Sequence, residues 1–381
     1  MLSGSAGKQV SLPYFDDPCE VFQRLRHLGD TVLLDSGSSA SRGQFDIVAA
    51  HPDASRSLFL DSACLGEPLR ASLSVWQTLA KQQIDQNPAP GDLPFHGGYI
   101  GHFSYELGRR LQGFKPAPDS TLPIAVVRYY PWAVVQDRKR ERSWLVGEAD
   151  AVSGIAASLE TLLNSQCENA HWPDFDLLEP FKERWSLADY DSRFKKVKDY
   201  ITGGDCYQIN IGQPFCAAFT GDLFTAYRQL RSIAKAPFSG FFPLDDKHAL
   251  LSLSPERFLT VDQGVVETRP IKGTRPRYAD FLQDQAAAAA LLASDKERAE
   301  NLMIVDLLRN DIGRFCKPGS IRVEELFALE SYSTVHHLVS AVTGVLASSH
   351  SALDLLLGCL PGGSITGAPK KRAREIIHEL E

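Results

Sequence analysis

The sequence feature that most constrains the fold is the segment from Glu256 to Arg277, in which two runs of strand-forming residues flank a Gln-Gly pair. Residues 256–262 and 265–269 have the composition of strands, and a two-residue connection ending in glycine is typical of a β-hairpin. A hairpin brings its outer ends together. Glu256, at the outer end of the first strand, is therefore predicted to lie near Lys272, just beyond the second.

Lys272 is the chemical centre of this segment, because arginines at positions 269, 275 and 277 surround it in the sequence. Nearby positive charge and partial burial both disfavour protonation of an amine, so the segment favours a neutral, nucleophilic side chain at Lys272. A nearby carboxyl would complete an acid–base pair. The alternative is a solvated basic loop in which Lys272 and Glu256 form a surface ion pair worth under about 1 kcal/mol. Pro255 and Pro270 leave the register of the hairpin open.

Composition excludes several classes of protein. The 40 basic and 47 acidic residues give a net charge of −7, which provides no overall basic field for nucleic acid or an anionic membrane. The seven cysteines are scattered, odd in number and without a Cys-x-x-Cys pair, as expected for reduced thiols in the cytosol. No window approaches the roughly 20 apolar residues that a membrane span needs. We therefore expect a soluble cytoplasmic protein with no nucleic-acid or membrane partner.

A polar and aromatic stretch at residues 166–185 is the best candidate for a linker between two regions. The first region, residues 10–165, contains strand-forming runs at residues 31–35 and 45–50. The small residues between these two runs either cradle a ligand or merely turn the chain. The second region, residues 186–381, begins with a Ser-x-x-Asp signal for the start of a helix.

Residues 204–212 of the second region alternate as a strand. The alternation places Gln208, Asn210 and Gly212 on one side. A strand side that carries two amides faces either water or a polar cleft. The adjacent histidines within residues 335–338 are predicted to face opposite ways on another strand, so that one of them can point into a cleft.

Glu300 lies on a predicted helix and shares a face with Ile304, Leu307 and Leu308. Burial of a lone carboxylate is costly unless a cation or hydrogen bonds compensate for it. Glu300 therefore either binds something positive, Mg²⁺ included, or ends the apolar stripe at its rim. Further along, a loop of small residues from position 361 opens a helix with clustered cations. It suits a carboxylate or phosphate, or is simply a polar helix start.

Six ordered motifs resemble those of the chorismate-utilising enzymes, over a match from about residue 31 to the last residue. The motifs are GDCYQ at 204–208, SLSPERF at 252–258, PIKGT at 270–274, RAENLMIVD at 298–306, VHHL at 335–338 and PGGSITGAPK at 361–370. Six motifs in one order are far beyond coincidence. Within that family the pattern is most similar to component I of the aminodeoxychorismate synthases, with component I of the anthranilate synthases as the nearest relatives.

The resemblance implies an α+β fold in which two antiparallel β-sheets pack as a sandwich with helices on the outside. The chorismate cleft is then built from the C-terminal half of the chain. Members of the family continue past the position of Glu381 with strands and a Glu-containing helix that complete the Mg²⁺ site. We therefore expect this chain to be a C-terminally incomplete fragment with weak Mg²⁺ binding and little activity.

Two positions distinguish the branches of the family. Anthranilate synthases carry a small residue where this chain has Lys272, whereas the aminodeoxychorismate enzymes carry a lysine that is thought to attack the substrate. Isochorismate and salicylate synthases carry a water-activating lysine where this chain has Gln208. The resemblance therefore implies an enzyme that forms aminodeoxychorismate, for p-aminobenzoate and folate biosynthesis.

The resemblance also implies roles for individual residues. Lys272 is the nucleophile that attacks C2 of chorismate, Glu256 protonates the departing C4 hydroxyl, and Glu300 is a ligand of Mg²⁺, which binds the chorismate carboxylate. Ammonia then adds at C4 and expels the lysine. It has to come from a separate glutamine amidotransferase subunit (component II), because the chain lacks a Gly-x-Cys-x-Gly nucleophile elbow. The implied substrate-binding residues are Gly273, Thr274, His337, Thr366, Gly367 and Ala368.

A second site is implied in the first region, because anthranilate synthases bind tryptophan there as an inhibitor. An aromatic amino acid is expected in the corresponding pocket of this chain, as an effector or as a structural ligand. The residues that correspond are Ser36, Arg42, Gly43, Gln44, Phe45, Pro237, Phe238 and Ser239.

Three other functions compete with this interpretation. The chain can be an anthranilate synthase component I, or an enzyme that uses Lys272 for Schiff-base chemistry on a carbonyl or pyridoxal substrate. No phosphate-binding segment is placed to support the second of these. The third is a non-enzymatic one, in which the truncated chain binds an aromatic amino acid and leaves chorismate unchanged.

Overall fold

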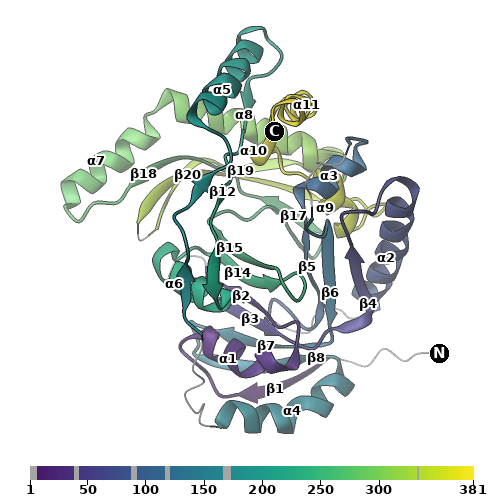
Figure 1. Cartoon of the computed structure of the whole chain (residues 1–381). Coiled ribbons are helices and arrows are strands. Elements are labelled where there is room, and N and C mark those ends of the chain that lie inside the picture. The colour runs from purple at the N-terminus through teal and green to yellow at the C-terminus, as the bar shows by residue number, and fades with distance from the viewer. Residues whose placement is uncertain (1–6, 38–42, 87–91, 116–120, 166–172, 333) are drawn as a thin grey trace. The chain divides into compact units, whose positions relative to one another are not determined.

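The computed structural model describes residues 7–37, 43–86, 92–115, 121–165, 173–332 and 334–381 (Figure 1). The chain forms two compact units. The first comprises Met1–Phe175 with Gly221–Pro255, and the second comprises Asp176–Thr220 with Glu256–Glu381. The sequence predicted one continuous second region, but the segment 221–255 belongs to the first unit. The reason is that β14 (Phe238–Pro243), which pairs with the following strand at residues 249–254, pairs on its other edge with β2 (Val32–Asp35).

The first unit contains ten strands among its described residues. They are β1 (Lys8–Leu12), β2, β3 (Phe45–Ala49), β4 (Asp53–Leu60), β5 (Gly98–Phe103), β6 (Ala125–Tyr130), β7 (Trp132–Asp137), β8 (Arg142–Gly147), β14 and β15 (Ala249–Ser254). Its helices are α1 (Pro18–Leu25) with the short 3-10 helix Arg26–Leu28, α2 (Gly66–Gln86), α3 (Tyr105–Leu111), α4 (Ala149–Asn164) and α6 (Leu223–Ala234). The chain crosses between the units at β9 (Phe175–Leu177) and β13 (Phe219–Gly221).

Two antiparallel sheets pack together within the first unit. Seven strands are ordered β1-β8-β7-β3-β2-β14-β15, and a separate sheet is ordered β4-β6-β5. The two sheets share a core in which Val32 and Ala133 of the larger sheet lie with Ile100 and Val126 of the smaller one. Another core, which includes Phe22 of α1, packs α1, α4 and α6 against the larger sheet (Figure 1). Burial of these apolar side chains is the main force that holds the unit together.

The second unit contains a further set of strands and six helices among its described residues. The strands are β10 (Lys182–Glu183), β11 (Gln208–Ile209), β12 (Phe215–Cys216), β16 (Thr260–Asp262), β17 (Val265–Thr268), β18 (Ile271–Pro276), β19 (Arg322–Ser331), β20 (Val335–Val345) and β21 (Gly367–Ala368). The helices are α5 (Leu187–Thr202), α7 (Phe281–Leu292), α8 (Asp295–Gly313), α9 (Ala352–Cys359), α10 (Gly363–Thr366) and α11 (Lys370–Leu380).

Strand β20 organises the second unit. Strands β17 and β18 pair with one edge of β20 in succession, and β19 pairs with its other edge. Helices α8 and α9 pack on this sheet through a core that includes Val305, Leu355, Val266 and Val342. Asn301 of α8 is fully buried and donates to the carbonyl of residue 338 in β20, which fixes α8 against the sheet. The helix that carries Glu300 and the strand that carries Lys272 are therefore held on one framework.

The structure confirms the turn of the predicted hairpin, but its first strand is confined to residues 260–262, so Glu256 lies before the strand rather than in it. Strand β16 pairs with β17 so that Thr260 lies opposite Glu267. Gln263 and Gly264 both have positive φ, of 47° and 79°, as a two-residue hairpin turn with the twist of the strands requires. The helix over residues 149–164 and the helix capped by Ser186 are also confirmed.

Other elements differ from the predictions. The strand predicted over residues 204–212 contracts to β11, because only Gln208 and Ile209 find a partner strand, β21. Strands β9 and β10 lie inside the predicted linker and pair with β13 and β12, so part of that linker belongs to sheets. Residues 166–172 of the predicted linker lie outside the described residues. Antiparallel sheets flanked by helices are confirmed, whereas the sandwich that contains a chorismate cleft stays a prediction.

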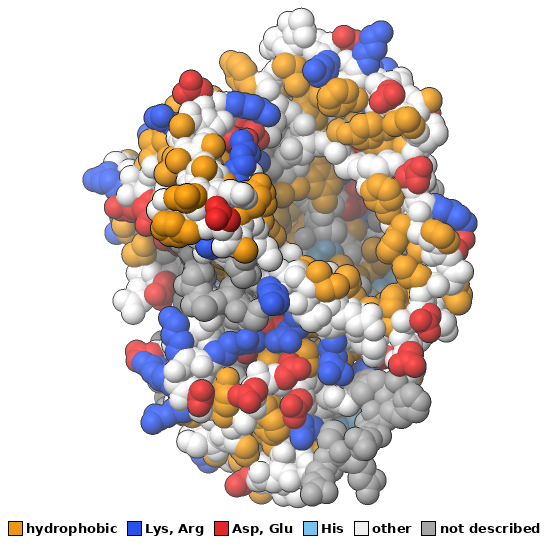
Figure 2. Space-filling model, turned by 90° about the vertical axis from the view of Figure 1, so that its left-hand side faces the viewer, with side chains coloured by type: hydrophobic (Ala, Val, Ile, Leu, Met, Phe, Trp, Pro, Cys, Tyr) orange, Lys and Arg blue, Asp and Glu red, His pale blue; other side chains and the backbone are white. Residues whose placement is uncertain are grey.

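Acidic and basic side chains are intermixed on the face drawn in Figure 2, which agrees with the modest net charge of −7. Hydrophobic side chains are also exposed on this face. In the part of the chain that the structure describes, no helix is both long enough and apolar enough to cross a membrane.

Candidate active site

Glu256 and Lys272 lie close enough in the second unit for the lysine charge to act on the carboxyl. Burial raises the pKa of Glu256, while the charge of Lys272, a hydrogen bond from Ser364 and one from the backbone of Ile271 act against that rise. The hydroxyl of Ser364 donates to Glu256 Oε1 over 3.2 Å. Lys272 itself is partly exposed at the start of β18. Glu256 and Lys272 are therefore within electrostatic reach of each other, and their roles as acid and nucleophile stay predictions.

A carboxyl that keeps its proton above the usual range of glutamate can act as a general acid near neutral pH. An amine beside it can act as a nucleophile when the single proton of the pair resides on the carboxyl. The second unit therefore offers a carboxyl with a raised pKa and an amine whose charge acts on it. A plain surface ion pair does not account for the burial of Glu256.

The arginines around Lys272 do not form the uncompensated positive field that the sequence suggested. Each guanidinium is engaged by carboxylates, which cancel much of its charge. The pairs are Arg269 with Glu325 (2.5 Å) and Glu330 (2.9 Å), Arg275 with Glu297 (3.7 Å), and Arg277 with Asp284 (2.8 Å).

Gly273 and Thr274 follow Lys272 at an irregularity in the pairing of β18 with β20. Gly273 has a φ of +85°, and a Cβ added there would lie 2.9 Å from Leu291 Cδ1, so backbone conformation and packing both require glycine. The hydroxyl of Thr274 lies 2.9 Å from Nδ1 of His337. Burial lowers the pKa of His337, which favours the neutral imidazole. These three predicted substrate-binding residues therefore lie together, next to Lys272.

The two adjacent histidines make different contacts, as their places on one strand predicted. His336 is buried and lies between the Ser331 hydroxyl, 2.7 Å from Nδ1, and the Asp284 carboxylate, 3.0 Å from Nε2. It therefore ties α7 to β19 and β20. His337 instead contacts Thr274 of β18 and the ring of Tyr332.

Glu300 accepts a hydrogen bond from the side-chain amide of Gln208 over 3.1 Å. Gln208 in turn pairs with Ala368 through β11 and β21. Gly367 has a φ of +143°, and a Cβ there would lie 2.1 Å from the carbonyl oxygen of Gln208, so only glycine allows the two strands to meet. The polar side of the 204–212 segment therefore contacts the carboxylate of α8 and does not simply face water.

Thr366, Gly367 and Ala368 are all buried beside β11. The hydroxyl of Thr366 donates to the carbonyls of Gly362 (3.2 Å) and Gly363 (3.3 Å), so this hydroxyl is used within its own loop. Their contact with a substrate carboxylate stays a prediction, and it would depend on the backbone more than on the Thr366 side chain.

The cations that follow this loop are also engaged by the protein. Lys370 donates to Asp311 over 2.7 Å and to the carbonyl of Cys359 over 2.8 Å, and burial lowers its pKa. Arg372 pairs with Asp205 at 2.8 Å. At the predicted anion site at the start of α11, two of the cations, Lys370 and Arg372, are therefore already paired with carboxylates of the protein.

Within the described residues, no group of three or more histidine, cysteine, aspartate or glutamate side chains converges to hold a metal ion. Glu300 supplies one carboxylate. Mg²⁺ is commonly bound through only one or two carboxylates together with water and substrate oxygens, so Glu300 fits the role of a single protein ligand.

Residues of the predicted amino-acid pocket come together in the first unit at one end of β2 and β14. Ser239 lies opposite Asp35 in the sheet, Ser36 is buried, and its hydroxyl donates to the carbonyl of Phe45 over 2.5 Å. Gln44 donates to Asp137 over 3.0 Å. Gly43 packs on Ser36. Strand β14 begins at Phe238, directly after Pro237. Arg42 lies outside the described residues.

Two buried carboxylates near Ser36 and Phe45, those of Asp35 and Asp46, were not predicted. Asp35 accepts from Arg138 over 3.0 Å and also pairs with Arg231, while Asp46 accepts from Arg138 over 2.5 Å. Burial raises the pKa of Asp46 to about 6. The sequence signal for these buried carboxylates was the presence of aspartates inside strand-forming runs. Their arginine partners lie about a hundred residues away or more in the sequence, so the pairing could not be predicted.

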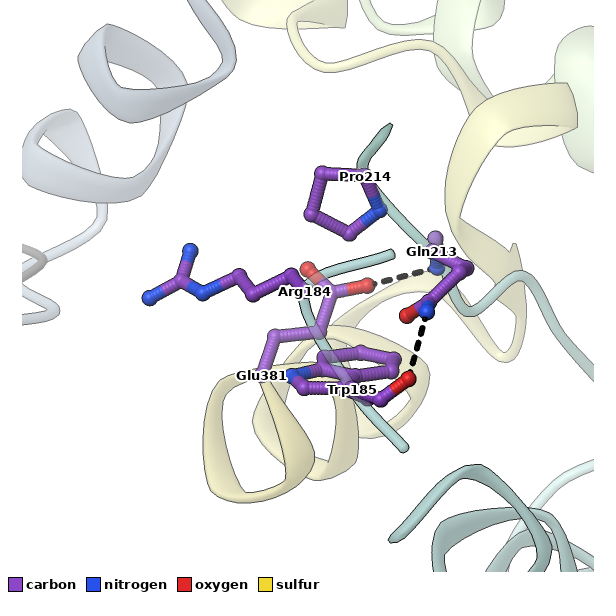
Figure 3. A pocket seen from close by; sticks show the side chains of 6 residues that line it. Arg184, Trp185, Gln213, Pro214 and Glu381 are labelled. Carbon is purple, nitrogen blue, oxygen red and sulfur yellow. Dashed lines mark hydrogen bonds between the residues drawn. The ribbon is translucent and has the colours of Figure 1, made fainter. Parts of the chain in front are cut away.

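A pocket of about 340 Å³ lies elsewhere in the second unit (Figure 3). Gln213 donates to the carbonyl of Trp185 over 3.0 Å, and Gly212 donates to the carboxylate of Glu381 over 2.8 Å. None of the predicted site residues lines this pocket. Its lining residues are Arg184, Trp185, Gly212, Gln213, Pro214 and Glu381.

Ser364 is the site residue that sequence reasoning missed, although it lies inside a motif that was recognised. Its neighbours Thr366 to Ala368 were chosen in its place. The signal available was a hydroxyl within a loop of small residues, which does not reveal a partner 108 positions away.

A family model of chorismate binding enzymes matches residues 31–381. The chain belongs to this family. It is 43% identical to a protein of Klebsiella aerogenes and 42% identical to one of Escherichia coli K12, both named aminodeoxychorismate synthase component 1. Each match covers 98% of this chain and 83% of the relative.

Solved structures agree with this assignment. Anthranilate synthase component I from Streptococcus pneumoniae superposes with a TM-score of 0.76 at 29% identity, over 89% of this chain and 77% of that one. The isochorismate synthase MenF from Escherichia coli has a TM-score of 0.70 at 13% identity, over 99% of this chain and 79% of that one. The likeness to MenF concerns the fold alone.

Proposed function

We propose that the protein is the chorismate-converting component of an aminodeoxychorismate synthase, which forms 4-amino-4-deoxychorismate and water from chorismate and ammonia. The observation that carries this proposal is the raised pKa of the half-buried Glu256 carboxyl, on which the charge of Lys272 acts. Relatives that bear this name at 41–43% identity over nearly the whole chain support it.

In the first step, the neutral amine of Lys272 attacks C2 of the chorismate ring. The ring double bonds shift, and the C4 hydroxyl departs as water with the proton of Glu256. The new C2–N bond leaves a positive charge on the lysine nitrogen, and transfer of its proton to Glu256 restores the acid. The raised pKa of Glu256 supports its role as the proton donor.

In the second step, ammonia attacks C4, the double bonds shift back, and the C2–N bond breaks. The lysine nitrogen leaves with a proton from Glu256, and the incoming ammonia gives up a proton in return. Lysine and carboxyl are then ready for another turnover. Covalent catalysis of this kind divides one difficult displacement into two easier ones.

The remaining site residues would bind and orient the substrate. Thr274 and His337 offer a hydroxyl and a neutral imidazole to the polar groups of chorismate. Gly273 is proposed to bring its backbone close to the substrate beside Lys272. The loop of Gly367 and Ala368 is proposed to meet a carboxylate mainly through Ala368, because the N–H of Gly367 donates to the carbonyl of Gly363. These contacts are proposed from their positions around Lys272 and Glu256.

Mg²⁺ is the proposed cofactor, and Glu300 is its proposed protein ligand. When bound, the ion would neutralise charge on the substrate carboxylate. The carboxylate of Glu300 already accepts from the Gln208 amide over 3.1 Å, which holds it in one orientation.

Replacing Glu300 by glutamine is expected to weaken activation by Mg²⁺ by about 10- to 100-fold, because a neutral amide is a poor ligand for a hard cation. The measurement is initial rate as a function of Mg²⁺ concentration. Asp306→Asn, which changes an exposed carboxylate of the same helix, serves as the control. An unchanged Mg²⁺ dependence in E300Q would remove Glu300 from the metal site.

Ammonia is proposed to come from a glutamine amidotransferase subunit that forms a heterodimer with this chain. The designation component 1 of its relatives supports the existence of a partner. A cytosolic location is proposed as well. The cysteines at the described positions are all free thiols, which supports a reducing compartment.

An aromatic amino acid, for which tryptophan is the probe, is proposed to bind near Ser36 and Ser239 in the first unit. The pairing of β2 with β14 supports this, because it brings both segments to one end of the sheet. Calorimetric titration with tryptophan tests the proposal. A heat of binding that is lost in Ser36→Trp is expected.

Identification of the product tests the proposed function directly. Chorismate with ammonium and Mg²⁺ is expected to give 4-amino-4-deoxychorismate. Anthranilate as the product would favour the other branch of the family. Unchanged chorismate together with tryptophan binding would favour a binding protein.

A further inference from the structure

Ser364 makes a contact to which the mechanism above assigns no role. Its hydroxyl donates to Glu256 Oε1 over 3.2 Å, across a separation of 108 residues in the sequence. Ser364 is partly buried in α10, and its hydroxyl is directed at the carboxyl proposed to deliver the proton. A hydrogen bond between such remote segments fixes one reacting group relative to another part of the site.

The backbone around Ser364 is held from two sides. The side chain of Asn210 donates to the Ser364 carbonyl over 2.6 Å, and the backbone N–H of Asn210 donates to the Thr366 carbonyl over 2.9 Å. On the other side, a Cβ added at Gly363 would lie 2.6 Å from Leu307 Cδ2, so α10 is packed tightly on α8. The hydroxyl of Ser364 therefore starts from a well-defined backbone position.

We propose that Ser364 is a positioning residue for the reaction: its hydroxyl orients the Glu256 carboxyl toward the departing hydroxyl of the substrate, and Asn210 holds Ser364 in place. Groups that act on the Glu256 carboxyl include Lys272 of β18, the backbone N–H of Ile271, and Ser364 of α10. Lys272 is engaged in the covalent bond to the substrate between the two steps. The hydroxyl of Ser364 takes part in no bond change, so it can keep the carboxyl aligned through both steps. The catalytic consequence rests on the proposed function.

A positioning role of this kind has a signature in pH dependence. The Ser364 hydroxyl donates to the ionised carboxylate and so lowers the pKa of Glu256. When this hydrogen bond is removed, one of the interactions that counteract the effect of burial is lost, so the pKa of Glu256 rises. In a profile of kcat against pH, the limb that belongs to Glu256 therefore moves to higher pH. Glu256→Gln identifies this limb, because the variant lacks it.

The kinetic test compares three variants. Ser364→Ala is expected to lower kcat by about 10-fold or more through misalignment of the acid, and to move the Glu256 limb to higher pH. Ser364→Thr keeps the hydroxyl and is expected to restore the position of the limb. Ile365→Ala changes the exposed neighbour and is the matched control, with an unaltered profile.

A measurement without turnover separates this inference from the proposed function. Carboxyl ¹³C resonances of labelled glutamate are followed with pH, and that of Glu256 is assigned by its absence in E256Q. It is expected to titrate at higher pH in S364A than in the wild type or S364T. Identical titration in all three proteins would overturn the role of Ser364 even if the enzyme makes aminodeoxychorismate. A shift in S364A would support the hydrogen bond even if chorismate proves inert.

Discussion

Replacing Lys272 by alanine is expected to lower the rate of 4-amino-4-deoxychorismate formation by about 10³-fold or more, in the range of losses that follow removal of an essential catalytic group. Alanine has no amine to form the C2–N bond, so both chemical steps lose their covalent route. Chorismate binding is expected to persist, because Thr274 and His337 remain in contact with each other without Lys272. The loss should therefore lie in kcat rather than in the dissociation constant of chorismate.

The measurements are steady-state kinetics and mass spectrometry of the protein incubated with chorismate in the absence of ammonia. The wild type is expected to carry one chorismate less one water on the peptide that contains Lys272. Lys317→Ala, at an exposed lysine of the same unit, is the control and should retain both adduct and activity. Unchanged turnover in K272A would remove lysine from the mechanism. Borohydride-dependent trapping would instead point to an imine.

The proximity of Lys272 to Glu256 could be predicted because it depends on a local feature. The hairpin turn at Gln263 and Gly264 fixes which residues face each other across β16 and β17. The contact of Gln208 with Glu300 depends instead on the pairing of β11 with β21, and those strands are more than 150 residues apart in the sequence. Periodicity within either segment carries no information about such a pairing.

The charges around the site illustrate the same limit. Sequence neighbours placed Arg269 and Arg275 beside Lys272, and this predicted a positive field. Their actual partners, Glu325 and Glu297, come from β19 and α8 and neutralise them. The division of the chain was misjudged for a related reason, since the strand pairs that return the segment 221–255 to the first unit are formed with residues some two hundred positions earlier. Local pattern selects Lys272 as the candidate nucleophile, and tertiary contacts decide its electrostatic surroundings.

Replacing Glu256 by glutamine is expected to lower kcat by about 10²- to 10⁴-fold, the usual contribution of a general acid. Glutamine preserves the shape of the side chain and can still accept from the Ser364 hydroxyl, but it cannot supply a proton to the departing C4 hydroxyl. Glu267→Gln is the control, because Glu267 is a carboxylate of the same segment that is paired with Arg257 and Arg269. It should change stability more than kcat.

The pH profile distinguishes loss of the acid from a general disturbance of the fold. Burial raises the pKa of Glu256, so the carboxyl keeps its proton to a higher pH than an ordinary glutamate. The pair of Glu256 and Lys272 is productive when its single proton resides on the carboxyl, so the raised pKa enlarges the productive fraction. E256Q should therefore lose one limb of the profile of kcat against pH, whereas E267Q keeps both. A variant E256Q that retained both limbs would show that another group delivers the proton.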